Sequence, residues 1–154
     1  MKKVLTGLTL LTCLISSSSF TKYEDKLPGW LVQRAFRAEF TTATDIRWQE
    51  ENQVAIATFN LNHSTVEAFF DLDGTLLGTA RFLKFDELPV LSISSMSNRF
   101  LNGIFHDPVE YTVNGELYYV MMVETPTKIL EVKVLPTGET VIRKSTRIIA
   151  ADPR

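Results

Sequence analysis

The chain has 154 residues, 45% of them hydrophobic and 22% charged, which is the composition of a compact globular protein and excludes an intrinsically disordered one. This length suits one domain, or two small units that share a core. The formal net charge of −2, without any lysine- or arginine-rich run, excludes the basic surface that nucleic acid binding needs, so we expect no nucleic-acid partner.

Residues 1–19 are predicted to be a secretory signal peptide. Two lysines precede an apolar run from Val4 to Ile15, and a serine tract follows the run. Twelve residues are too few to span a bilayer, and the serines place cleavage after Ser19. We therefore expect an exported protein, periplasmic or extracellular, whose mature chain 20–154 has a net charge of −4 and no membrane span. A buried N-terminal helix is the weaker alternative, because the serine tract ends the run without a helix cap.

Cys13 is the only cysteine of the chain and offers a second route to the cell envelope. A lipoprotein signal needs its cysteine directly after the apolar core, with a very small residue before it. Here Thr12 precedes Cys13, and Leu14 and Ile15 continue the apolar run, so lipid attachment is the less favoured alternative. Cleavage after Ser19 would leave a mature chain with neither disulfide nor thiol chemistry.

The first predicted element is a helix over residues 28–40, which begins with a proline suited to a first helical turn. Its apolar stripe comprises Leu31, Val32, Ala35, Phe36, Arg37, Ala38 and Phe40. From Asp45 to Leu83 apolar and polar residues then alternate with period two. Breaks at Glu51-Asn52, Asn62-His63-Ser64 and Asp73-Gly74 predict four antiparallel strands joined by tight turns.

The same order of elements follows in the second half of the chain. Residues 86–103 are predicted to be helical, with Ile93, Met96, Phe100 and Ile104 on one stripe. Four more strands are predicted at residues 109–113, 116–124, 128–135 and 139–149. Their predicted turns contain Asn114-Gly115, Thr125-Pro126-Thr127 and Thr137-Gly138.

These elements form an internal repeat at an offset of 64 residues. The offset aligns Val32, Phe36 and Phe40 with Met96, Phe100 and Ile104; Ala57 and Phe59 with Met121 and Val123; Val66, Ala68 and Phe70 with Leu130, Val132 and Val134; and Gly74 with Gly138. One such unit would bury little apolar surface alone, so we expect the halves to share one sheet and one core. We predict an α+β fold that is a tandem duplication of an α-β4 unit, with repeats over approximately residues 27–86 and 87–150.

The string FFDLDGTLL, residues 69–77, matches the first motif of haloacid-dehalogenase-type phosphotransferases, in which the first aspartate attacks phosphorus. In the second half the corresponding stretch, residues 132–141, reads VKVLPTGETV, so Leu135 and Thr137 replace Asp71 and Asp73 while the glycine is retained as Gly138. The 80 residues after Gly74 are patterned as sheet and one helix, and a parallel β/α phosphatase core cannot be built from them. We therefore expect a turn here, no catalytic residues and no enzyme, and we keep a Mg²⁺-dependent phosphatase as a minor alternative.

Other chemistry-bearing residues are sparse. The two histidines, His63 and His106, fall in a predicted turn and a loop without clustered cysteine or carboxylate ligands, so we predict neither metal nor cofactor. A calcium loop starting at Asp71 would need glutamate at its twelfth position, where the chain has Phe82. Trp48, on the first predicted strand, is expected to be a core or covering residue rather than a ligand platform.

The order of these motifs resembles the PepSY-like, beta-lactamase-inhibitor-like family of small bacterial envelope proteins. The resemblance is carried by AFRAEF in the first helix, DIRWQ in the first strand, the FDLDGTLL hairpin and DELP before the second helix. It covers nearly all of the mature chain and implies two helices packed on one face of a curved antiparallel sheet. It implies no inhibitory residues and only loosely supports a binding or inhibitory module.

Strand alternation divides the predicted sheet into two faces. Ten positions are expected to face the helices: Ala57, Phe59, Val66, Ala68, Phe70, Met121, Val123, Leu130, Val132 and Val134. The opposite face mixes apolar and charged residues, and its candidate binding positions are Ile56, Phe69, Tyr118, Val120, Met122, Lys133 and Arg143. Because exposed apolar patches rimmed by charge mark interaction sites, we predict a surface for an unidentified envelope protein or peptide. A structural envelope protein that self-associates through its sheet edges is the main alternative, and the oligomeric state stays open.

Overall fold

The structure is a computed structural model that describes residues 27–148. The predicted signal peptide, its cleavage site and Cys13 lie outside the described residues. The first half of the chain contains helix α1 (Trp30–Glu39) and strands β1 (Thr44–Glu51), β2 (Val54–Leu61), β3 (Ser64–Asp71) and β4 (Leu76–Phe82). The second half contains the short 3₁₀ helix η2 (Phe85–Glu87), helix α2 (Val90–Arg99) and strands β5 (Ile104–Phe105), β6 (Val109–Val113), β7 (Glu116–Glu124), β8 (Lys128–Val134) and β9 (Thr140–Arg147). Within residues 27–148, no helix is long and apolar enough to cross a membrane.

All nine strands of the described residues join one antiparallel sheet, ordered β1-β2-β3-β4-β6-β7-β8-β9, with β5 paired to β7. Short turns fix the pairing of neighbouring strands. In the turns at Asn52-Gln53, Asn62-His63 and Asn114-Gly115, both central residues have positive φ. This conformation is the one whose twist matches that of the flanking strands, and it explains why asparagine and glycine recur at these turns. The expected α+β fold with an antiparallel sheet is confirmed.

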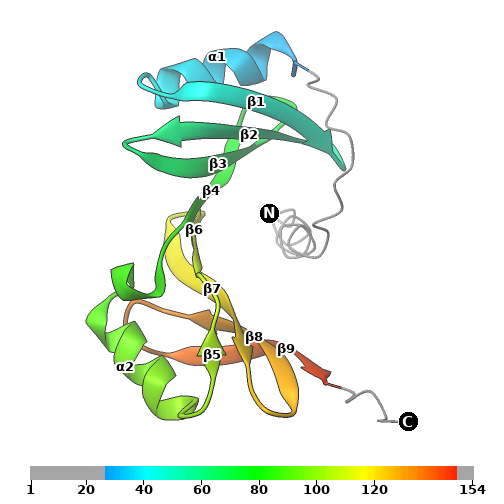
Figure 1. The fold of residues 1–154 in the computed structure, drawn as a ribbon. Helices are drawn as coiled ribbons and strands as arrows, with labels where there is room; N and C mark the ends of the chain where they lie inside the picture. The colour runs from blue at the N-terminus through cyan, green and yellow to red at the C-terminus, as the bar shows by residue number, and fades with distance from the viewer. Residues whose placement is uncertain (1–26, 149–154) are drawn as a thin grey trace, which may run out of the picture.

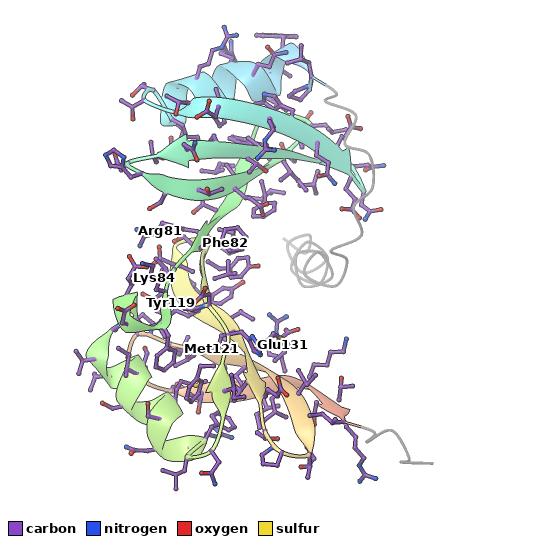
Figure 2. All side chains as sticks on the ribbon, in the orientation of Figure 1. Arg81, Phe82, Lys84, Tyr119, Met121 and Glu131 are labelled. Carbon is purple, nitrogen blue, oxygen red and sulfur yellow. The ribbon has the colours of Figure 1, made fainter. Side chains whose placement is uncertain are left out.

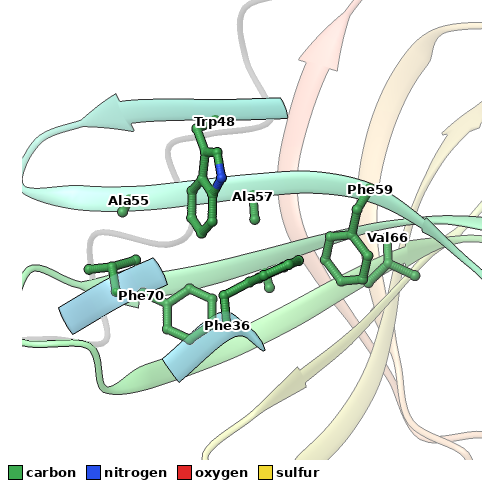
Figure 3. Packing of buried hydrophobic residues seen from close by; sticks show 9 residues of the cluster. Phe36, Trp48, Ala55, Ala57, Phe59, Val66 and Phe70 are labelled. Carbon is green, nitrogen blue, oxygen red and sulfur yellow. The ribbon is translucent and has the colours of Figure 1, made fainter. Parts of the chain in front are cut away.

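Helix α1 buries one side against the first half of the sheet (Figure 1). Phe36 is at the centre, with its ring 5.1 Å from Trp48 and 5.0 Å from Phe59 in edge-on contacts. Figure 3 shows this aromatic cluster between the helix and strands β1–β3. Trp48 is therefore a core residue, as expected. The predicted stripe was too wide, because Arg37 and Ala38 are exposed.

Helix α2 packs in the same way against the second half of the sheet, with Met96 fully buried. The prediction that Ile104 continues its stripe is wrong, since Ile104 belongs to strand β5 and is 61% exposed. The helices correspond at an offset of 60 residues, so that Met96 takes the place of Phe36, whereas the strands correspond at 64. The segment between α2 and β6, which contains β5, holds the four additional residues.

The pairing register places both helices on one face of the sheet. All ten positions expected to face the helices lie in the two clusters formed around α1 and α2. Figure 1 shows the sheet bent so that the helices lie on its outer side. The opposite side, called the concave face below, is the inside of that bend.

Candidate functional site

The phosphatase-like string forms the hairpin turn between antiparallel strands β3 and β4. One carboxylate oxygen of Asp71 accepts hydrogen bonds from the backbone N–H groups of Asp73, at 3.1 Å, and Thr75, at 2.8 Å. Gly74 has a φ of +87°, and a Cβ atom there would lie 2.9 Å from the carbonyl oxygen of Leu31. The turn therefore needs glycine and uses the first aspartate as a cap. Within the described residues no three His, Cys, Asp or Glu side chains are grouped so as to hold a metal ion.

The candidate binding residues all point to the concave face, but three of them are not exposed. Ile56, Phe69 and Val120 are only 7%, 3% and 4% exposed. They belong to a third apolar cluster, together with Tyr111, Val113 and Ala80. The prediction of an exposed patch running through these three residues is therefore wrong.

The burial of Phe69 follows from a small residue on the neighbouring strand β4. Gly78 pairs with Phe69 on one side and with Val113 on the other, and both face the concave side. The sheet bends at β4 (Figure 1), and glycine has no side chain, so the larger side chains of β3 and β6 meet in one cluster beside Gly78. The cluster is thus covered by its own neighbours.

The accessible part of the candidate site consists of Tyr118, Met122, Lys133 and Arg143, which are partly exposed and which we call the concave strip. The ring of Tyr118 stacks on that of Tyr111 beneath it, with centroids 5.4 Å apart and planes 17° apart. The Lys133 ammonium lies 4.0 Å from the centroid of the Tyr118 ring. The strip therefore combines an aromatic stack with a cation over it.

A carboxylate anchors the other end of the concave strip. Glu131 lies beside Met122 in the pairing of β8 with β7, and its carboxylate is 3.5 Å from Nε of Arg143. Glu131 and Met121 point to opposite sides of the sheet, the latter toward α2 (Figure 2). Because this ion pair is partly shielded from water, it holds the guanidinium in place better than a fully exposed pair would.

Burial raises the pKa of the Tyr111 hydroxyl far above its ordinary value, and the nearby carboxylates of Glu67 and Glu131 add to this effect. Burial likewise raises the pKa of Tyr118, against the lowering effect of Arg143. Both phenols are therefore neutral at physiological pH and act as hydrogen-bonding, stacking groups. This arrangement is suited to recognition of another molecule.

Sequence reasoning missed one member of this face, Tyr111, and did not select Glu67 as a candidate binding residue. Tyr111 could have been found, because the two-residue Asn114-Gly115 turn fixes Tyr111 opposite Tyr118. Strand alternation places Glu67 on the same face as Phe69, but alternation gives no sign that the Glu67 carboxylate lacks a partner.

Comparison with known proteins finds similarity in fold to several solved structures. No protein-family model matches the chain, and no curated protein matches it significantly. A BLIP-like protein from Bacteroides fragilis aligns with a TM-score of 0.70 and 20% identity over 84% of this chain and 92% of that chain. A DUF2874 family protein from Bacteroides ovatus aligns with a TM-score of 0.71 and 17% identity over 79% of this chain and 89% of that chain.

A third structure, of a Bacteroides eggerthii protein with a provisional periplasmic assignment, aligns with a TM-score of 0.69 and 18% identity. The alignment covers 80% of this chain and 91% of the Bacteroides eggerthii chain. These similarities establish a BLIP-like fold of two helices on an antiparallel sheet. At such low identity they concern the fold alone.

Proposed function

We propose that this chain is an exported, non-enzymatic binding or inhibitory module that recognises an envelope protein or peptide through the concave strip. The observation that carries this proposal is the partly exposed set of Tyr118, Met122, Lys133 and Arg143 on the sheet face that bears no helix. Tyrosine, methionine and arginine are enriched in protein interfaces. The similarity to a BLIP-like protein and to a protein assigned provisionally to the periplasm agrees with this role.

Differential capture tests the proposal. The full-length chain, tagged at its C-terminus, is expressed and its purified product is incubated with envelope extract. The test variant combines Tyr118→Ala with Lys133→Glu. The matched control combines Leu117→Ala with Lys128→Glu, which makes the same kinds of change on the same two strands at exposed positions facing the other way.

The proposal expects a protein that is retained by the unmodified chain and by the control but lost by the test variant. Circular dichroism and thermal unfolding establish that both variants are folded. If the test variant retains the same proteins as the unmodified chain, the concave strip is not the binding surface and the proposal fails.

We also propose a common origin for the two halves and membership of the PepSY-like group. Gly74 and Gly138 support the duplication, because each has a positive φ and sits against the backbone near the start of one helix. The ten matching core positions of the strands support it as well. An unfolding study of the separated halves would test whether either can fold without the other's strands.

Self-association through sheet edges is the second candidate function. The edge strands differ in charge: β1 carries Asp45, Glu50 and Glu51 against one arginine, whereas β9 carries Arg143, Lys144 and Arg147 and no acid. Unpaired edges of opposite charge favour contact between copies. Sedimentation at several concentrations tests this, and a monomer at every concentration would exclude it.

The minor alternative is a phosphatase that uses Asp71 and Asp73. It predicts hydrolysis of a phosphomonoester that requires Mg²⁺ and is abolished by Asp71→Asn. We propose the absence of such activity, because the carboxylate of Asp71 already accepts two backbone hydrogen bonds within its own turn.

A further inference from the structure

Two glutamates occupy corresponding places on the concave face, but only one has a cationic partner. Glu67 lies seven residues before Gly74, and Glu131 lies seven residues before Gly138. Glu131 is paired with Arg143 at 3.5 Å. Glu67 has no ion pair and no hydrogen bond to any residue in the described part of the chain.

The neighbouring strands explain the difference. Strand β9 has an irregularity here: Glu131 pairs with Lys144 and Val132 with Ile142, so the extra residue Arg143 lies between these partners and reaches Glu131. In the pairing of β3 with β4, Glu67 stands opposite Ala80, which offers no charge. Glu67 is largely shielded from water, and this burial raises the pKa of its carboxyl group. A shielded carboxylate without a cation is costly, although its oxygens still reach the surface and can accept a partner.

A continuous row of side chains leads from Glu67 across the sheet. The register pairs Glu67 with Ala80, Ala80 with Tyr111, and Tyr111 with Tyr118. Lys133 then lies over the ring of Tyr118, and its ammonium group forms no ion pair within the described residues. The row therefore has an unpaired acid at one end, an aromatic floor, and an unpaired base at the other.

We propose that this row binds an extended segment of the partner protein that carries a basic side chain for Glu67 and an acidic side chain for Lys133. The inference rests on the proposed function and adds the chemistry of the bound segment. Aromatic or apolar side chains of the same segment pack on Tyr118 between the two charges. In this complex the partner supplies to Glu67 the cation that Arg143 supplies to Glu131.

The spacing of the two charges in the partner follows from sheet geometry. Four strand-to-strand steps separate β3 from β8, and neighbouring strands lie about 4.8 Å apart, so the row is roughly 19 Å long if flat. An extended chain advances about 3.3 Å per residue, so the flat distance corresponds to about six residues. The bend of the sheet shortens this span, and we expect the basic and acidic residues to be about four to six positions apart.

A displayed library of random 12-residue peptides is the probe. The protein is produced from the full-length chain, immobilised and used for selection, beside Glu67→Gln, Lys133→Glu and the opposite-face control Lys128→Glu. The unmodified protein and the control should enrich peptides with one Lys or Arg and one Asp or Glu at the stated spacing. Peptides selected on Glu67→Gln should no longer be enriched in Lys or Arg at that position. Peptides selected on Lys133→Glu should no longer be enriched in Asp or Glu.

Individual enriched peptides are then titrated against each variant. We expect about tenfold weaker binding for each single-charge variant, which corresponds to one partly shielded ion pair. If the enriched peptides fail to bind Tyr118→Ala but show no charge pattern, the charge inference is overturned while the proposed function stands. If enriched peptides bind Tyr118→Ala as well as the unmodified protein, or if none are enriched, both are overturned.

Discussion

Three turn glycines with the same backbone conformation allow the role of the DLDGT turn to be measured. Gly74, Gly115 and Gly138 have φ values of +87°, +78° and +88°. A Cβ atom at Gly115 would meet nothing within 4 Å, whereas one at Gly74 would lie 2.9 Å from the carbonyl oxygen of Leu31. At Gly138 it would lie 2.8 Å from the carbonyl oxygen of Leu91. The comparison separates backbone strain from collision with a helix.

The expected cost of each substitution by alanine follows from these contacts. Gly115→Ala should lower the free energy of unfolding by about 1–2 kcal/mol, the cost of a left-handed conformation for a residue with a Cβ atom. Gly74→Ala and Gly138→Ala carry the same cost plus that of pushing a helix backbone away, about 1–3 kcal/mol for overpacking. We therefore expect a loss of about 2–5 kcal/mol at either position.

Urea unfolding followed by circular dichroism measures these differences. The midpoint should fall most for Gly74→Ala and Gly138→Ala, with an unchanged dependence on urea concentration that confirms cooperative unfolding. Equal losses for Gly74→Ala and Gly115→Ala would refute the reasoning, because the contact with α1 would then contribute nothing.

Three further changes test packing and charge. Ser92→Ala should cost about 1–3 kcal/mol in urea unfolding, because the buried hydroxyl donates a 2.8 Å hydrogen bond to the carbonyl oxygen of Leu135; a neutral result would contradict that role. Burial raises the pKa of Glu67, so its contribution to stability is present below the ordinary value of 4.5 and is lost as the pH rises through the folded-state value. Glu67→Gln should therefore be the more stable protein at pH 8, with the difference vanishing in thermal unfolding near pH 4; a difference independent of pH would exclude this cause. Val120→Glu should prevent stable folding, whereas Met122→Glu should be tolerated, and equal circular dichroism melting curves for the two would contradict their assigned burial.

Much of the fold could be predicted because its signals are local. Alternation with period two assigned Phe59, Val66 and Val132 to the helix face, since a strand that is covered on one side must alternate. The Asn114-Gly115 turn fixed a register in the same way, because two residues with positive φ close a hairpin of one geometry. Each of these inferences needs only residues adjacent in sequence.

The exposure of the candidate site could not be predicted, because it depends on residues from distant strands. Alternation correctly placed Phe69 and Val120 on the concave face, but it does not report the curvature of that face. The burial of Phe69 depends on Gly78, which pairs with Phe69 in β3 and with Val113 in β6. Val120 is buried in the same cluster from β7, a strand still farther along the chain. The error at Ile104 has the same cause. Helical spacing assigned Ile104 to the stripe of the second helix, but Ile104 lies in strand β5, which pairs with the distant strand β7.

The aspartates of the DLDGT string show why a motif requires its structural context. In the first turn the N–H of Asp71 donates to the carbonyl of Thr75 at 3.0 Å, and in the second turn that of Leu135 donates to Glu139 at 2.8 Å. The backbone of the turn is thus the same with and without a carboxylate, so the aspartate caps a turn that does not depend on it. A phosphotransferase needs this aspartate at the end of a parallel strand, free to reach a phosphate, whereas here it lies in an antiparallel hairpin with its oxygen engaged.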